Sequence, residues 1–255
     1  MNLIFEYIHY RWRANFVPKV NNETVTKIIN CVQYASKPLA FEFHLNAIRK
    51  RTKKDSRLID VADFGAGSKK LGQKRKIKEI YRQSTSSKKY QRILYHLVQE
   101  FHCENMLEMG TSLGFTSVYI SLANVKGKIT TLEACPQTAR EAKHLFDENK
   151  YTNIELINMT FEDFFKNKQP KLWDFVFIDG HHDGKALLQY LEILKPILCE
   201  NALLVLDDVR WSKGMLEAWK SLKNDKNFPL QFDLFRMGIL VFSNNQSVER
   251  YRFSI

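Results

Sequence analysis

Apolar residues in the second half of the chain fall into short continuous runs. These runs alternate with longer segments in which apolar positions recur every three or four residues. A short apolar run between turn residues is typical of a buried β-strand, whereas the longer spacing is typical of one face of a helix. We expect strands at residues 105–110, 128–134, 153–159, 173–179, 201–209, 228–235 and 237–243. We expect helices at residues 114–124, 136–150, 183–198 and 214–224.

This alternation predicts a doubly wound α/β fold with a mostly parallel, seven-stranded sheet. Near-continuous apolar strands such as "WDFVFID" fit a sheet that is covered on both faces. Only a tight turn around Arg236 separates the last two strands, so we expect them to form an antiparallel C-terminal hairpin. In such sheets ligands bind beyond the carboxyl ends of the strands, and a site is expected there.

The first 104 residues are predicted to be mostly helical, with helices at 22–36, 41–51 and 90–101. Between them, the loop "DFGAGSKK" at 63–70 contains Gly65 and Gly67. A glycine loop can cradle a phosphate. This loop lacks the Lys-Ser/Thr pair of a P-loop, which favours a plain turn.

The composition is that of an ordinary globular protein, with 44% hydrophobic and 26% charged residues. No apolar run reaches the ~18 residues of a membrane-spanning helix, so no membrane partner is expected. The N-terminal "MNLIFEYIHYRWRANF" has no basic leader or cleavage site, and we expect it to belong to the fold. The four cysteines form no CxxC pair. This argues against a zinc site or a disulfide framework and favours a cytoplasmic location.

The positive charge is concentrated in the N-terminal part. Residues 1–104 hold 21 Lys and Arg against 9 Asp and Glu, a formal charge of +12 within a total of +11. The charge peaks at 68–92, which can be a solvated helical surface or a surface that attracts an anionic substrate or nucleic acid. Only Tyr81 and Tyr90 are aromatic there, so base stacking has weak support.

Two turns carry candidate binding residues. Glu108, Gly110 and Gly114 form an E-x-G-x-x-x-G turn between a strand and a helix, unlike the G-x-G-x-x-G of dinucleotide-binding proteins. A carboxylate there would repel a pyrophosphate and attract the cationic end of an amino acid; a purely structural turn is the alternative. Glu133 ends the next strand, where an acidic side chain can accept hydrogen bonds from ribose hydroxyls. The alternative for Glu133 is a surface carboxylate beside a helix start.

Three carboxylates follow two other expected strands. Asp179 ends one strand, and Asp207 and Asp208 end the next. Adjacent strands lie ~4.8 Å apart, so the three side chains should converge. They would resist ionising together unless a cation joins them. Oxygen ligands favour Mg²⁺, Mn²⁺ or Ca²⁺. A metal-free polar cleft is the alternative.

The segments "LEMGTSLGFTSVYISLA", "ITTLEACP", "DFVFIDGHH" and "ALLVLDDVRW" resemble the class I S-adenosylmethionine-dependent methyltransferases, which have a Rossmann-like fold. They are most similar to the metal-dependent small-molecule O-methyltransferases of the catechol and macrolide-sugar type. The resemblance covers about residues 86–243. It divides the chain into an N-terminal helical and basic extension at 1–85, expected to cap the acceptor site, and a methyltransferase domain at 86–255.

The resemblance implies roles for the cofactor-binding residues. Glu108 and Gly110 would line the methionine end of S-adenosylmethionine, with Ser112 and Gly114 in the same loop. Glu133 would hold the ribose. Thr160 and Phe161 would flank the adenine, and Met159 stands where the family often has a carboxylate that binds the adenine amino group.

The resemblance also implies catalytic roles. Asp179, Asp207 and Asp208 would hold a divalent metal, and Asp179 would also contact the cofactor and act in catalysis. His182 stands three residues after Asp179, where catechol-type enzymes carry a lysine base. His181 is the other candidate for the base, or for a metal or substrate contact. The alternative for both histidines is a helix-capping or surface role. Arg210 and Trp211 are expected to wall the acceptor pocket.

These features predict metal-assisted O-methylation of a small hydroxylated acceptor, on which the basic 68–92 stretch could recognise an anionic group. A nucleic-acid methyltransferase is the second hypothesis, although "DGHH" replaces the Asn/Asp-Pro-Pro-aromatic motif of base-methylating enzymes. A non-catalytic cofactor-binding module or an NAD-linked enzyme is the third, and the glycine spacing speaks against NAD. Related enzymes are often dimers, so a homodimer is expected.

Overall fold

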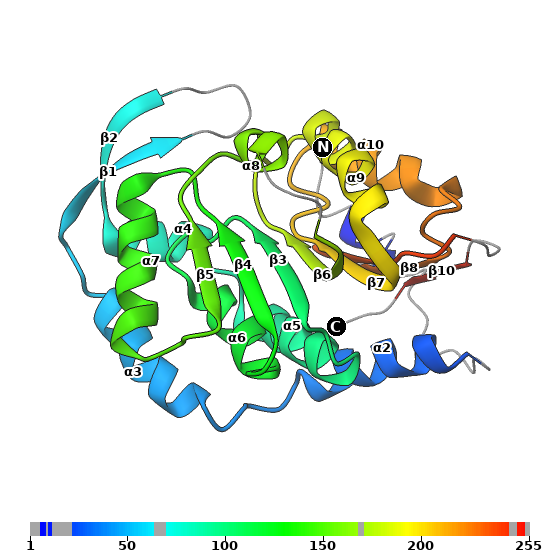
Figure 1. Cartoon of the computed structure of the whole chain (residues 1–255), viewed down its shortest axis with the longest axis horizontal. Coiled ribbons are helices and arrows are strands. Elements are labelled where there is room, and N and C mark those ends of the chain that lie inside the picture. The colour runs from blue at the N-terminus through cyan, green and yellow to red at the C-terminus, as the bar shows by residue number, and fades with distance from the viewer. Residues whose placement is uncertain are drawn as a thin grey trace.

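The computed structural model describes residues 6–8, 10–11, 22–63, 70–167, 171–244 and 249–252, and its centre is one eight-stranded sheet (Figure 1). The strands are β3 (Asn105–Met109), β4 (Lys128–Leu132), β5 (Ile154–Ile157), β6 (Trp173–Ile178), β7 (Leu198–Leu206), β8 (Leu230–Leu234), β9 (Met237–Val241) and β10 (Glu249–Arg252). Their order is β10-β8-β9-β7-β6-β3-β4-β5. The expected seven strands are confirmed, and β10 extends the sheet beside β8.

Strands β3 to β7 are parallel, so their carboxyl ends meet at one edge of the sheet (Figure 1). Strand β9 runs antiparallel to both β7 and β8, which confirms the expected C-terminal hairpin. Strand β10 pairs in parallel with β8. The edge where β3, β4, β6 and β7 end is therefore where the loops of the parallel strands gather.

Helices cover both faces of the sheet because its strands are apolar on both sides. In β6, Phe175 and Phe177 enter the core on one face, and Val176 and Ile178 enter the core on the other. The first core includes residues of α2 (Glu23–Tyr34), α5 (Lys88–Glu100) and α6 (Phe115–Ala123). The second includes residues of α8 (Phe161–Asn167), α9 (Gly184–Leu194) and α10 (Lys213–Ser221).

A third apolar cluster joins the N-terminal part to the sheet. It contains residues of α3 (Glu42–Thr52), α6 and α7 (Pro136–Glu148). The buried carboxylate of Glu42 pairs in a bidentate manner with Arg92 of α5, at 2.6 Å to Nε and 2.7 Å to Nη2. The residues on both sides of position 85 thus share apolar packing, while the division at that position stays a prediction.

The region from Leu58 to Ser84 differs from the expected helical surface. It forms an antiparallel two-stranded sheet of β1 (Leu58–Asp63) and β2 (Lys70–Lys76), followed by α4 (Ile77–Ser84). The helical interpretation of 68–92 is therefore wrong for β2. Local spacing could not show this, because the partner of β2 is β1, which in turn packs against α7. Within the expected glycine loop, residues 64–69 with Gly65 and Gly67 lie outside the described residues.

Helices in the described part of the chain lack the length and apolar character needed to cross a membrane. The N-terminal segment was expected to belong to the fold. Of it, residues 6–8 and 10–11 are described, and Tyr10 is buried with its hydroxyl donating to the carbonyl oxygen of Asp233.

Candidate active site

A cavity of about 890 Å³ lies beyond the carboxyl ends of β3, β4, β6 and β7. Its wall includes most of the residues expected at the site: Gly110, Ser112, Glu133, Thr160, Phe161, Asp179, His181, His182, Asp207, Asp208 and Trp211. The parallel topology explains this convergence, because each residue follows a strand of the same sheet. Glu108, Gly114 and Arg210 are not among the lining residues.

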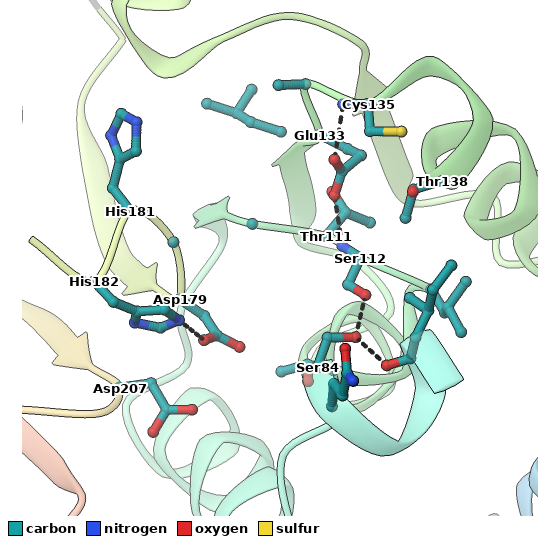
Figure 2. A pocket seen from close by; sticks show the side chains of 18 of the residues that line it. Ser84, Thr111, Ser112, Glu133, Cys135, Thr138, Asp179, His181, His182 and Asp207 are labelled. Carbon is teal, nitrogen blue, oxygen red and sulfur yellow. Dashed lines mark hydrogen bonds and ion pairs between the residues drawn. The ribbon is translucent and has the colours of Figure 1, made fainter. Parts of the chain in front are cut away.

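Glu133 connects two turns of the cavity wall. Its carboxylate accepts hydrogen bonds from the backbone N–H groups of Ser112 and Cys135, each over 2.9 Å (Figure 2). Burial is the largest influence on this carboxyl and raises its pKa to about 7, while the two N–H donors act in the opposite direction. The side chain is thus held in a fixed position beside the loop that follows β3.

Two glycines shape that loop. Gly110 has a φ of +111°, and a Cβ built on it would lie 2.2 Å from the carbonyl oxygen of Asp179. Gly114 has a φ of +79° and precedes the first residue of α6. A side chain at Gly110 would therefore collide with the strand end that carries Asp179, so the glycine lets the two loops meet.

Glu108 is not among the residues that line the cavity, and its expected contact with the cofactor stays a prediction. Its side chain is fully buried in β3 and accepts hydrogen bonds from the hydroxyls of Thr131, over 2.6 Å, and Ser117. Burial raises its pKa to about 7, against the effect of the two hydroxyls. Because Thr131 also shares a 2.6 Å hydrogen bond with Thr111, Glu108 supports the loop from behind rather than lining the cavity.

Asp207 and Asp208 have close protein partners in the cavity wall. Asp207 accepts hydrogen bonds from the hydroxyl of Ser86 over 2.9 Å and from the backbone N–H of Asp208 over 2.8 Å. Asp208 forms an ion pair with Arg236 at 2.6 Å. Burial, followed by the charges of neighbouring carboxylates, raises the pKa of Asp179 and of Asp207.

The donor set does not fit the expected divalent metal. Across the residues that the structure describes, no group of three or more Asp, Glu, His or Cys side chains is arranged so that it could hold a metal ion. The expected convergence of the strand ends is present. However, the carboxylate of Asp208 is directed to Arg236 and that of Asp207 to Ser86.

The two histidines face different partners. Nε2 of His182 lies 3.9 Å from Oδ1 of Asp179, and its ring packs 5.5 Å from that of Trp211. Nδ1 of His181 forms a hydrogen bond with the hydroxyl of Tyr190, and its ring meets that of Phe161 edge to face. His182 therefore lies beside Asp179 (Figure 2). His181 packs against Phe161 instead.

Arg210 is not part of the acceptor wall that was expected of it. It is buried and pairs with the carboxylate of Asp233 at 2.8 Å from Nη1 and 2.7 Å from Nη2. Trp211, the next residue, is exposed and lines the cavity. The turn after β7 sends these neighbouring side chains in different directions.

Sequence reasoning missed the connection between α4 and α5. Ser84 shares a 2.5 Å hydrogen bond with Ser112, and Ser86 donates to Asp207, so this connection contacts both the loop after β3 and the end of β7. The hydroxyl run "STSS" at 84–87 within the basic stretch was the available signal. Arg236 was also missed, because its place depends on how β8 and β9 pair.

Comparison with known proteins agrees with this architecture. Residues 107–209 match a family model described as a methyltransferase domain. A protein-L-isoaspartate O-methyltransferase of Methanococcus maripaludis (strain C6 / ATCC BAA-1332) is 28% identical over 99 residues, which are 37% of this chain and 47% of that relative. The match therefore spans about half the length of that relative.

Solved structures share the fold at low identity. An O-methyltransferase from Bacillus cereus in complex with SAH matches with a TM-score of 0.56 and 20% identity, over 65% of this chain and 89% of that one. TomG from Streptomyces achromogenes, an O-methyltransferase in complex with SAM, matches with a TM-score of 0.57 and 16% identity, over 65% of this chain and 87% of that one. The SAH-bound Podospora anserina methyltransferase PaMTH1 matches with a TM-score of 0.57 and 16% identity, over 82% of this chain and 98% of that one. The chain therefore has the fold of these methyltransferases, and its residues 107–209 match a methyltransferase domain.

Proposed function

We propose that the chain transfers the methyl group of S-adenosylmethionine to a hydroxyl oxygen of a small acceptor. The observation that carries this proposal is one cavity that joins Glu133 and the Gly110 loop to the pair of His182 and Asp179. A cofactor held by Glu133 through its ribose would place its reactive end toward the strand ends of β3 and β6.

His182 is the proposed general base. It would accept the hydroxyl proton while the acceptor oxygen forms a bond to the methyl carbon and the carbon–sulfur bond breaks, which leaves S-adenosylhomocysteine. Asp179 would orient the imidazole, since its carboxylate faces Nε2. The rest of the rate would come from holding the oxygen and the methyl group in line. No step of this proposal passes through a metal, because the donor set does not fit one.

The acceptor is proposed to be a small hydroxylated molecule that carries an anionic group. Arg75 of β2 supports this proposal, because it brings a cationic side chain to the wall of the cavity. The side chain of Gln73, also in β2, accepts a hydrogen bond from the Arg75 guanidinium over 3.3 Å. The basic hairpin would thus face the anionic group while His182 faces the hydroxyl.

The test incubates the full chain with S-adenosylmethionine and a panel of catechols, sugars and phosphorylated sugars, and measures S-adenosylhomocysteine release. His182→Asn should lower kcat by about 100- to 10,000-fold, with S-adenosylhomocysteine affinity unchanged. The control is His144→Asn, which removes an exposed histidine of α7 that pairs with Glu148. Unchanged turnover by the His182 variant would contradict the role of the base. Direct titration that showed binding of NAD instead of S-adenosylhomocysteine would contradict the cofactor.

A further inference from the structure

The carboxylates at the ends of β6 and β7 need a neighbouring positive charge. Residues Ile178 and Leu206 are paired in the parallel sheet, so the following residues, Asp179 and Asp207, leave the sheet side by side. Asp207 is buried, and Asp179 is mostly shielded from solvent. Buried carboxylates are costly unless a cation or a proton compensates them.

Arg236 supplies a cation at this position. It lies in the short turn between β8 and β9, and its carbonyl oxygen accepts a 2.9 Å hydrogen bond from the backbone N–H of Val209. This bond fixes the turn against the segment that follows Asp208. The guanidinium donates to Oδ1 of Asp208 from Nε over 3.0 Å and from Nη2 over 2.6 Å.

An aromatic ring holds the guanidinium from another side. Its central carbon lies 5.8 Å from the ring centroid of Tyr90 in α5, within the range of a cation–π contact. Arg236 also lines the cavity. The guanidinium is therefore held in part by α5, whereas the carboxylates follow β6 and β7.

A divalent cation would have to compete with these contacts. Oδ1 of Asp208 already receives two N–H donors, and both oxygens of Asp207 receive donors from Ser86 and the backbone. A dication between Asp207 and Asp208 would also lie next to the guanidinium, whose like charge would repel it. An arginine cannot lose its charge at physiological pH, so this competition is permanent.

We infer that Arg236 takes the place of a divalent cation beside Asp207 and Asp208, so that this site excludes Mg²⁺, Mn²⁺ and Ca²⁺. Arg236 is a positioning residue for the carboxylates in the cavity wall. The inference deepens the proposed function, because it assigns methyl transfer in this chain to His182 without a metal. The exclusion of the cation is nevertheless measurable without any acceptor.

The test measures thermal unfolding of the full chain with saturating S-adenosylhomocysteine, with and without millimolar Mn²⁺. Wild type should show no Mn²⁺-dependent shift. Arg236→Met removes the charge and keeps most of the side-chain volume, and should gain a Tm rise of about 5 to 10 °C at Mn²⁺ roughly 100-fold above Kd. Arg236→Lys keeps the charge and should show no rise. The double variant Arg236→Met/Asp207→Asn should lose the gain, which assigns the ion to this site.

The matched control is Arg252→Met, which removes an arginine that lies 3.7 Å from Asp233, away from the cavity. It should behave as wild type. A Mn²⁺-dependent rise in wild type that Asp207→Asn abolishes would overturn the inference, as would the absence of any rise with Arg236→Met. A Tm that does not respond to S-adenosylhomocysteine would instead contradict the proposed cofactor, so the two failures are distinguishable.

Discussion

The backbone N–H of Ser112 donates a 2.9 Å hydrogen bond to Oε2 of Glu133. This contact ties the loop after β3 to the end of β4, and the second oxygen of Glu133 accepts the N–H of Cys135. Each carboxylate oxygen keeps a lone pair for a further donor. The geometry therefore leaves Glu133 able to accept hydrogen bonds from a bound ribose while it holds both turns.

Replacement of Glu133 should weaken cofactor binding. Hydrogen bonds to a charged group contribute about 1.5 to 3 kcal/mol, so we expect Glu133→Ala to raise the Kd of S-adenosylhomocysteine roughly 10- to 100-fold. Glu133→Gln keeps one acceptor and should have a smaller effect. Isothermal titration calorimetry measures the Kd of S-adenosylhomocysteine for wild type and both variants, at a pH above the Glu133 pKa of about 7. Glu148→Gln on the exposed end of α7 is the control. Equal affinity of the Glu133→Ala variant and the control would contradict the ribose role.

The buried carboxyl of Glu108 should make stability depend on pH. Its pKa is raised from 4.5 to about 7 in the fold, so the unfolded chain loses its proton first as pH rises. The contribution of Glu108 to stability is therefore fully present below pH 4.5 and is lost between pH 4.5 and 7.

The loss should amount to as much as about 3 kcal/mol relative to Glu108→Gln. Urea unfolding of both proteins across this pH range gives the difference. If the difference in free energy of unfolding stays constant, or grows in favour of wild type as pH rises, burial does not raise the pKa of Glu108.

Gly110→Ala should disrupt the site as well as the fold. The new Cβ would meet the carbonyl oxygen of Asp179 at 2.2 Å and would stand on a backbone with a φ of +111°. We expect a destabilisation of at least about 1 to 3 kcal/mol and loss of S-adenosylhomocysteine binding.

The matched control is Gly214→Ala in α10, where the nearest atoms lie at 3.8 Å and φ is not positive. Alanine favours a helix over glycine by up to about 1 kcal/mol, so this variant should be neutral or more stable. Equal Tm values for the two variants would contradict the close approach at Gly110.

The hydroxyl of Tyr190 should matter through its position between two side chains. It meets Nδ1 of His181 and donates to Oε1 of Glu162 over 2.5 Å. Tyr190→Phe removes this link and keeps the ring, so we expect S-adenosylhomocysteine affinity to fall about 2- to 10-fold with kcat little changed. Tyr151→Phe, outside the cavity wall, is the control. A fall in kcat at constant affinity would instead place His181 in the chemical step.

Periodicity was sufficient to predict strands β3 to β9, because burial on both faces requires apolar runs in the sequence, whereas β10 was not predicted. The run "WDFVFI" became β6, and the parallel order then brought Asp179 beside Asp207 without further information. Contacts between segments that are distant in the sequence produce no local pattern of apolar residues. Strand β2 has a charged sequence and gains its structure from pairing with β1, so its residues resembled a solvated helix.

The candidate site shows the same limit at the level of single side chains. The position of Glu133 after β4 could be predicted, whereas the inward direction of Glu108 depends on the hydroxyls of Ser117 and Thr131. The pairing of Asp208 with Arg236 depends on how the β8–β9 turn meets the end of β7. Sequence could place the carboxylates together, but it could not show which cation they meet.

The cavity wall draws residues from Val61 to Arg236, so its segments come from most of the length of the chain. A ligand in this cavity would contact several of these segments at once and would stabilise each of them against local unfolding. Local opening of the β1–β2 hairpin, the α4–α5 connection or the β8–β9 turn would each cost the binding free energy. Slower hydrogen exchange on cofactor binding should therefore extend from the hairpin to the last strands, well beyond the loops that touch the ligand.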